Sequence, residues 1–466
     1  MHEHPAPISR RRLLQLGAAA SAAGLAACAG PIPSLVPSLS SRGSAQSAPA
    51  ASASPRPSPT PMPTPNVATG RVLYRDGALA DGRSATLQRH TSILVDAGRI
   101  AWIRPADGEA DASGATVIDC LGATFVPGLV DCHSHVTGPG GANWIERFSD
   151  PPEVLLEVAE HNARIGLAAG VRWMRDVGSP IGVDPADGRE RALALAVRDR
   201  WAGRADRPYL RAAGSWLFRR GANPIPAAVA VENADELVEA AVGQLDDGAD
   251  LVKLYMDGPD ADASPWSAAE VARVVEAAHA RNARVAAHAG RVSGARAAVT
   301  GGVDSIEHGF DLDGQVAAEM VRRGTTLVST LAVMRSWISF GSTTTLPRFA
   351  EEPGRSQVLA RLEMAEASVR TARDAGVKIA TGSDFGGGSL RANQLAWEVT
   401  SLVAAGLEPA DALAAATWRG GELIGEDEAG VIREGGPSDF FLVHGDPLSD
   451  PDALWRVWRT AWESSS

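Results

Sequence analysis

Cysteine is scarce in this sequence, with three residues among 466, so a small domain held together by disulfides is excluded. Positive charge is also in deficit, because 44 lysine and arginine residues face 56 aspartate and glutamate residues. The resulting net charge of −12 provides no long-range attraction to nucleic acid or to an anionic membrane. At about one domain per 100 to 200 residues, the length allows two or three domains.

The first 28 residues have the pattern of an export signal. Three arginines at positions 10 to 12 precede an alanine-rich apolar stretch that ends in Leu25-Ala26-Ala27-Cys28. A basic segment followed by a short apolar core is typical of a secretory signal, which is too short to remain as a membrane span. The paired arginines resemble a twin-arginine signal. The last four residues resemble a lipobox, in which Cys28 becomes the lipidated first residue, although a non-lipidated signal is the alternative.

Residues 29–66 are rich in proline, serine and alanine and contain few bulky apolar side chains. Such a segment cannot bury enough surface to repay its ordering entropy, and its prolines favour an extended spacer. We therefore expect a disordered linker on an exported protein, a cell-surface or periplasmic lipoprotein of a bacterium. If Cys28 carries lipid, Cys120 and Cys132 remain, and we expect both to be buried free thiols.

From residue 67 onward, short β-branched runs predict a small antiparallel sheet, with strands near 67–74, 92–95, 100–103 and 116–119. Apolar runs then alternate with helical stretches in eight successive units, which favours a (β/α)8 TIM-like barrel over an open sheet. These eight runs are 124–131, 171–177, 209–216, 250–255, 284–288, 303–307, 325–330 and 377–381.

Strand character returns at 430–444, which predicts that both chain ends build one small β-sandwich beside the barrel. The predicted fold class is therefore α/β, a barrel with a sandwich domain. Its segments are an export signal at 1–28, a linker at 29–66, the N-terminal portion of the sandwich at 67–124, the barrel at 125–425, the C-terminal portion of the sandwich at 426–458 and a tail at 459–466.

Side chains that can bind a metal fall at the C-terminal ends of the predicted barrel strands, where enzymes of this architecture carry their active sites. His133 and His135 close the first run, and their i, i+2 spacing places both on one side of an extended strand. At or just after the ends of later runs stand Lys253, His288, His308 and Asp384. A single histidine there is more often structural, but four at independent strand ends indicate a site for Zn²⁺ or a similar divalent ion.

Lys253 is notable because the chain holds 42 arginines and only two lysines, the other being Lys378. A lysine at a strand end therefore suggests a need that guanidinium cannot meet. In a site of low dielectric an amine can lose its proton and react with CO2, and the resulting carbamate offers two anionic oxygens that can bridge two metal ions. An ordinary buried lysine is the alternative.

Six segments carry a more specific signal. They are Val126-Pro-Gly-Leu-Val-Asp-Cys-His-Ser-His135, Arg175-Asp-Val-Gly178, Val252-Lys-Leu-Tyr255, Val285-Ala-Ala-His288, Ser305-Ile-Glu-His-Gly309 and Thr381-Gly-Ser-Asp384. Taken in order, they resemble the metal-dependent amidohydrolase superfamily, and most nearly its imidazolonepropionase-like and Xaa-Pro dipeptidase-like branch. The resemblance covers about residues 67–455. The chain differs by stopping shortly after Trp455, without an evident last sandwich strand.

The resemblance implies that His133, His135 and Asp384 hold one metal ion. It implies that His288 and His308 hold a second, and that carboxylated Lys253 bridges both. The implied activity is cleavage of an amide or related C–N bond, as in a dipeptide or an N-acyl amino acid, by a hydroxide that bridges the two ions.

Roles for the surrounding side chains follow from this mechanism. Asp384 accepts a proton and passes it to the leaving group. Tyr255 is a candidate donor to the oxyanion or the substrate, or a packing residue. Arg219 and Arg220 are candidates to bind an anionic part of the substrate, although a solvated pair is the simpler interpretation.

Two alternatives stay open at this point. One is a mononuclear deaminase or cyclic-amide hydrolase in which Lys253 is only structural. The other is a surface lipoprotein that binds a ligand without turnover. In each case we expect a small-molecule ligand, no nucleic acid, and membrane contact only through Cys28, with homo-oligomerisation left open.

Overall fold

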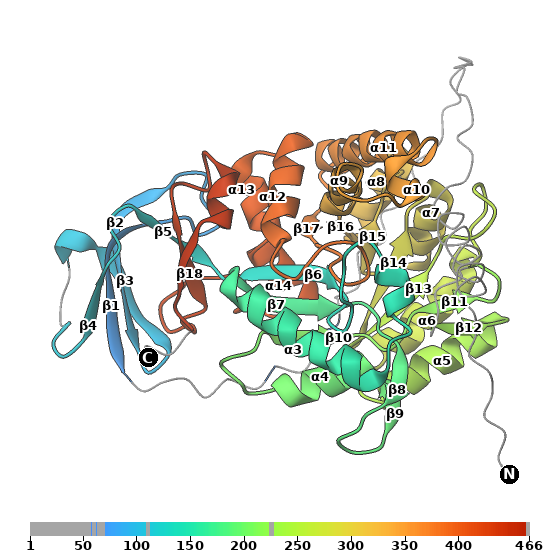
Figure 1. Ribbon diagram of the computed structural model, residues 1–466, viewed down its shortest axis with the longest axis horizontal. Coiled ribbons are helices and arrows are strands. Elements are labelled where there is room, and N and C mark those ends of the chain that lie inside the picture. Colours follow the sequence, from blue (N-terminus) through green and yellow to red (C-terminus); the bar gives the residue numbers. More distant parts are fainter. Residues whose placement is uncertain (1–56, 58–61, 63–69, 109–111, 223–227, 463–466) are drawn as a thin grey trace, which may run out of the picture.

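The computed structural model describes residues 57, 62, 70–108, 112–222 and 228–462. The predicted export signal, Cys28 included, lies outside these residues. Figure 1 shows a small sheet at one end of the molecule and a larger body in which helices surround parallel strands. Among the described helices, none combines the length and apolar character needed to cross a bilayer.

Both ends of the chain contribute to one mixed sheet, which has seven strands within the described residues. The strand order is β19-β18-β5-β1-β2-β3, with β4 paired to β1. The sheet is not purely antiparallel as predicted, because β1 pairs in parallel with both β4 and β5. Its strands are β1 (Arg71–Leu79), β2 (Gln88–Asp96), β3 (Arg99–Pro105), β4 (Thr116–Asp119), β5 (Ala123–Pro127), β18 (Phe440–His444) and β19 (Val457–Thr460).

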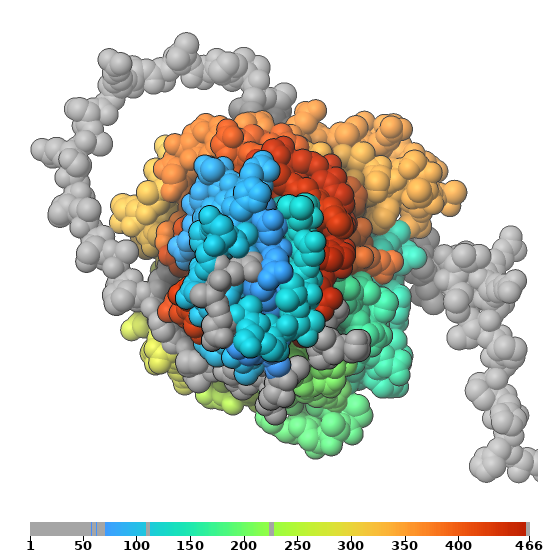
Figure 2. Space-filling view, turned by 90° about the vertical axis from the view of Figure 1, so that its left-hand side faces the viewer, coloured from blue at the N-terminus to red at the C-terminus, as the bar shows by residue number. Residues whose placement is uncertain are grey.

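Figure 2 looks onto this end of the molecule, where the first strands and the C-terminal segments lie together. The sequence showed no evident last strand for this sheet, and that prediction is wrong, because β19 pairs with β18. β19 also extends past the predicted boundary at residue 458. The interior between the strands is apolar and aromatic. The rings of Tyr74, Phe125 and Phe440 meet edge to face, with centroids 5.1 to 6.4 Å apart.

The larger body contains two parallel sheets, of order β10-β7-β6 and β12-β11-β13-β14-β15-β16-β17. Isolated parallel bridges link the two sheets, one joining Ser134 to Phe385 and the other joining Ala213 to Leu251. The strands are β6 (Leu129–Ser134), β7 (Val171–Asp176), β10 (Tyr209–Ala212), β11 (Leu217–Arg219), β12 (Val229–Val231), β13 (Leu251–Tyr255), β14 (Arg284–Ala289), β15 (Ser305–His308), β16 (Thr326–Ser329) and β17 (Ile379–Thr381). A separate hairpin pairs β8 (Ile181–Val183) with β9 (Glu190–Ala192).

The first predicted run, 124–131, is divided between the two bodies. Its first residues belong to β5, which pairs with β18, and its last residues begin β6. Between them the amide of Gly128 donates to the carbonyl of Asp439, and a Cβ at this position would lie 2.6 Å from Cβ of Arg172. The chain therefore passes from one sheet to the other at a residue that has no room for a side chain.

Helices follow most of the parallel strands and cover the outside of the larger body (Figure 1). Ser267 caps α6 and forms a capping box with Glu270. The helices are α2 (Trp144–Arg147), α3 (Pro152–Ala168), α4 (Leu193–Trp201), α5 (Ala234–Asp246), α6 (Ala268–His279), α7 (Val292–Gly301), α8 (Gly314–Arg323), α9 (Leu331–Phe340), α10 (Pro347–Ala350), α11 (Gly354–Ala375), α12 (Leu395–Ala404), α13 (Pro409–Ala415) and α14 (Trp418–Ile424), with 3-10 turns η1 (Ala106–Gly108) and η2 (Pro451–Trp455).

Two described residues of the predicted linker lie against the larger body. The carbonyl of Pro57 accepts a hydrogen bond from Arg284, the first residue of β14. Met62 packs on an apolar cluster that includes the buried thiol of Cys132. Cys120 and Cys132 are both buried and free, as predicted.

A buried ion pair joins the segment before β18 to the start of β7. Arg172 is 1% exposed, and its Nε donates to Oδ1 of Asp439 at 2.7 Å. The same guanidinium donates to the carbonyls of Ala205 and Arg207 and lies 4.4 Å from the ring centroid of Tyr209. Because it is buried on all sides, this cation depends on its one carboxylate partner.

Replacing Asp439 with alanine is expected to lower the free energy of unfolding by about 3 kcal/mol, because it leaves the Arg172 charge buried and uncompensated. Urea titration of the purified protein measures this change. Glu232→Ala is the control, since Glu232 and its partner Arg220 are both more than half exposed, and it should cost less than about 1 kcal/mol. Equal losses in the two variants would contradict the assignment.

Candidate metal centre

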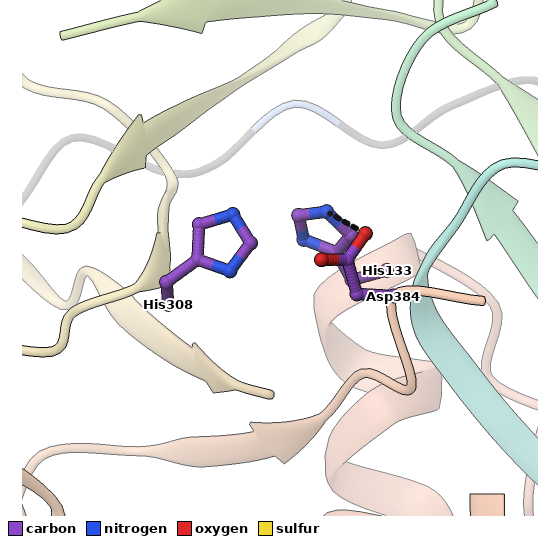
Figure 3. Close-up of side chains that lie close together, drawn as sticks. All are labelled: His133, His308 and Asp384. Carbon is purple, nitrogen blue, oxygen red and sulfur yellow. Dashed lines mark ion pairs between the residues drawn. The ribbon is translucent and has the colours of Figure 1, made fainter. Parts of the chain in front are cut away.

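The side chains predicted to bind metal converge at the C-terminal ends of the parallel strands. Ring centroids are 5.4 Å apart for His133 and His135, 4.7 Å for His133 and His308, and 4.6 Å for His288 and His308. Ligand atoms of His133, His308 and Asp384 all lie within 4.8 Å of one another. Figure 3 shows these three side chains close together, with His133 and His308 coming from β6 and β15 and Asp384 from the segment after β17. Residues far apart in the sequence therefore share one site.

The backbone is strained where two of these residues sit. His308 and Asp384 have positive φ angles of 72° and 52°, which non-glycine residues rarely adopt. Glycines let the segment after β17 approach the histidines, because a Cβ at Gly382 would overlap Cβ of His133 and one at Gly387 would overlap the ring of His135. The strain thus accompanies close packing of the Asp384 loop against the imidazoles.

Three of the histidines are held through Nδ1. That atom lies 2.7 Å from Oε2 of Glu307 in His133, 2.6 Å from the carbonyl oxygen of Gly178 in His135, and 2.8 Å from Oγ1 of Thr330 in His308. Nε2 is the nitrogen left toward the site. In His133 and His135 it lies 3.5 and 3.4 Å from Oδ1 of Asp384. An outer partner of this kind fixes the tautomer and orientation of a metal-binding imidazole.

Glu307 belongs to a fully buried polar network. Its Oε1 accepts from Nη2 of Arg175 at 2.8 Å and from the hydroxyl of Ser305 at 2.5 Å. Burial raises the pKa of Glu307, but the positive charges of Arg175 and Lys253 outweigh this effect and hold it below its ordinary value. Glu307 is therefore an anion that can hold His133 with Nδ1 protonated.

Lys253 is 1% exposed, and its Nζ has no hydrogen-bond partner among the described residues. Burial lowers the pKa of this amine to about 8, against the pull of Glu307. A buried, unpaired amine with a pKa near neutrality is the form that reacts with CO2. The amine also fits a position between two metal ions, because its carbamate would carry the negative charge that metal ions bind.

Burial also acts on the imidazoles. It lowers the pKa of His133 well below the ordinary value, helped by the charge of Lys253, and it lowers that of His308, helped by His288. Burial lowers the pKa of His135 as well, but the hydrogen bond and charge of Asp384 outweigh it and the net shift is upward. Neutral imidazoles are the form that binds metal, so His133 and His308 are ready to do so. The donor set of imidazoles, a carboxylate and an amine fits a divalent cation.

Aromatic side chains cover the His135 side of the site. The rings of Trp216 and Phe148 have centroids 5.4 and 6.2 Å from that of His135. Further out, Trp144 stacks on Trp337 of α9, with centroids 5.6 Å apart. This flank is therefore apolar, and Trp337 of α9 packs against it.

The three predicted substrate contacts have other partners. Tyr255 stacks on His288, with centroids 3.8 Å apart and planes 10° apart. Arg219 lies over Trp266 and donates to the carbonyl of Pro265. Arg220 pairs with Glu232 at the surface.

The residues that hydrogen-bond to the candidate metal-binding histidines were not predicted from the sequence. Glu307 and Arg175 stood there only as members of motifs, and Asp257, beside His288, was not considered. One signal was available, because a charged residue inside a run predicted to be a buried strand needs a buried partner. Arg175 and Glu307 both meet that condition.

Comparisons with known proteins show what this chain is similar to as a whole. A sequence model of the amidohydrolase family matches residues 124–460. An uncharacterized protein of Mycobacterium tuberculosis is 29% identical over 355 residues, covering 74% of this chain and 85% of that protein. An imidazolonepropionase of Ectopseudomonas mendocina is 27% identical over 413 residues, covering 80% and 91%. The crystal structure of a Xaa-Pro dipeptidase with bound methionine is similar with a TM-score of 0.71 at 26% identity, over 83% of this chain and 97% of that one.

The lowered pKa of Lys253 predicts how the metal-free protein responds to pH. Below about pH 8 the amine is charged in both folded and unfolded chains, and the folded state carries the full cost of burying it. Between pH 8 and its ordinary pKa of 10.5, only the unfolded chain keeps the proton, so stability rises with pH. Lys253→Met removes this cost and should be the more stable protein at pH 7.

Urea unfolding of chelator-treated protein in CO2-free buffer measures the effect. The advantage of Lys253→Met over the unsubstituted chain should shrink by about 2 kcal/mol from pH 7 to pH 9.5. An advantage that does not change with pH would mean that the buried amine keeps its proton across this range, so that folding does not lower its pKa.

Proposed function

The chain belongs to the amidohydrolase family, and from this premise we propose that it cleaves the amide bond of a dipeptide or an N-acyl amino acid. It is an enzyme, a metal-dependent hydrolase that acts on a carbon–nitrogen bond. The observation that carries the proposal is the meeting of His133, His308 and Asp384 beside the unpaired amine of Lys253.

We infer that two divalent ions, most simply Zn²⁺, bind here. His133, His135 and Asp384 would hold the first, His288 and His308 the second, and carboxylated Lys253 both. Such ions supply Lewis acidity, which polarises a substrate carbonyl and lets water attack at neutral pH. The orphaned Nζ of Lys253 supports two ions over one, because the carbamate would satisfy it.

Asp384 is the residue that moves the proton in this proposal. Its Oδ1 lies between Nε2 of His133 and Nε2 of His135, and its side chain is largely buried. The carboxylate takes the proton of the attacking water and gives it to the leaving nitrogen, so that the amine departs neutral. No covalent enzyme intermediate is needed.

The substrate class rests on the site's surroundings and on the relatives. The aromatic flank formed by Phe148 and Trp216 favours an apolar group on the substrate beside His135. A Xaa-Pro dipeptidase, whose name gives a dipeptide as its substrate, is similar to this chain in structure. We keep Tyr255 as a candidate donor to the substrate. Arg219 and Arg220 remain weaker candidates, because each has a partner of its own.

The mononuclear deaminase or cyclic-amide hydrolase remains the second candidate, because the imidazolonepropionase relative covers 80% of the chain. Catalysis itself is favoured over ligand binding without turnover, since the family and its named neighbours are hydrolases. The number of bound metal ions separates the two enzymatic candidates.

Three further proposals concern the fold of the protein and its location. We propose that the parallel strands form a (β/α)8 barrel, because the bridges Ser134–Phe385 and Ala213–Leu251 link both ends of the two parallel sheets. We propose that the mixed sheet is a small sandwich domain. We also propose that the protein is exported and anchored through Cys28, on the strength of its N-terminal sequence.

Metal analysis tests the bridging role of Lys253. The purified protein should bind two metal equivalents per chain, and Lys253→Ala should bind fewer, with partial recovery when a short carboxylic acid is added. Lys378→Ala is the matched control, because Lys378 is the other lysine and lies exposed beside Glu422. One equivalent that Lys253→Ala leaves unchanged would favour the mononuclear candidate.

A panel of dipeptides and N-acyl amino acids tests the activity. Substrates with an apolar group should be hydrolysed, and Asp384→Asn should lower kcat about 10²- to 10⁴-fold because the amide cannot accept the proton. Fully metal-loaded protein that hydrolyses nothing in the panel, while it deaminates or opens cyclic amides, would overturn the assignment.

A further inference from the structure

His288 is held differently from the other three histidines. Within the described part of the chain its Nε2, and not its Nδ1, faces a protein partner, lying 3.1 Å from Oδ2 of Asp257. The other three are held through Nδ1 and leave Nε2 toward the site. The nitrogen that His288 leaves uncommitted is therefore Nδ1.

Asp257 is fixed in place by its surroundings. It is 6% exposed, and its Oδ2 also accepts the amide of Gly290 at 2.8 Å, so that one carboxylate ties the segment after β13 to the end of β14. A Cβ at Gly294 would lie 3.1 Å from Oδ1 of Asp257 and 2.6 Å from the carbonyl of Met256. The first turn of α7 thus packs directly on the carboxylate.

The loop that carries Asp257 is also held from the other side. Nη1 of Arg291 donates to the carbonyls of Gly258 at 2.8 Å and Asp260 at 3.0 Å. One face of the His288 ring is covered by Tyr255, and the ring of His308 meets it edge to face. The plane of the imidazole is therefore set by packing, and the choice between its two nitrogens is left to Asp257.

We propose that Asp257 is a positioning residue for the metal centre, which accepts Nε2–H of His288 and thereby presents Nδ1 to the second metal ion. This role rests on the proposed binuclear site. It adds a residue that touches neither substrate nor metal and acts only through His288. It also gives the second ion a support that is independent of the Glu307 network behind the first.

Equilibrium metal binding of the full chain tests the role. Titration of metal-free protein with Zn²⁺ against a chelator should give two equivalents, and Asp257→Ala should weaken the second about 10- to 100-fold while the first is unchanged. Asp257→Asn should recover most of the loss, because its amide oxygen can still accept from Nε2. Asp260→Ala is the matched control on the same loop, where the side chain is exposed, and it should change neither equivalent.

Nitrogen NMR of the unsubstituted, Zn²⁺-loaded protein with ¹⁵N-labelled histidine gives a second readout that needs no variant. His288 should carry its proton on Nε2, whereas His133, His135 and His308 should carry theirs on Nδ1. A proton on Nδ1 of His288 overturns the role of Asp257.

The outcomes separate this role from the proposed function. A second equivalent that is equally tight in Asp257→Ala overturns the positioning role and leaves the binuclear site standing. The absence of a second equivalent in the unsubstituted chain overturns the binuclear site and the role together.

Discussion

The metal centre depends on one constraint. A buried imidazole that turns one nitrogen toward the metal site needs a hydrogen-bond partner for its other nitrogen. Three imidazoles, a carboxylate and an amine are buried in an environment that disfavours charge, and the partly buried ring of His288 lies against that of His308. Outer hydrogen bonds from Glu307, Thr330 and the Gly178 carbonyl fix which nitrogen of an imidazole faces inward. Lys253 differs from these imidazoles, because its Nζ has no such partner among the described residues.

The site is also asymmetric in its surroundings. The His135 side is lined by Phe148 and Trp216, whereas the His288 side is lined by Tyr255 and the carboxylate of Asp257. An apolar flank lowers the local dielectric and strengthens every electrostatic interaction within the site. A polar flank that is already hydrogen-bonded keeps its shape when a ligand binds. The two halves of the centre therefore favour different chemical groups of a substrate.

The sequence predicted that the histidines and Asp384 would meet, because polar residues at the carboxyl ends of parallel strands lie at one edge of the sheet. It also predicted the two buried free thiols, Cys120 and Cys132. It could not predict that the run 124–131 divides at Gly128, because that depends on the approach of Arg172 from another strand. For the same reason Glu307 and Asp257 were missed as supports, since their partners lie 174 and 31 residues away in the sequence.

The position of β18 has a consequence for the order of assembly. It lies between β5 and β19, so that β5 finds its partner more than 300 residues later in the chain. A pairing between such distant segments forms late, because the entropy of closing the loop is lost before any contact is gained. As the ribosome releases the chain from the N-terminus, β1 to β5 must wait with one edge open until the final thirty or so residues emerge. Removing those residues would therefore leave β5, which lies far earlier in the chain, with an unprotected strand edge that is prone to association.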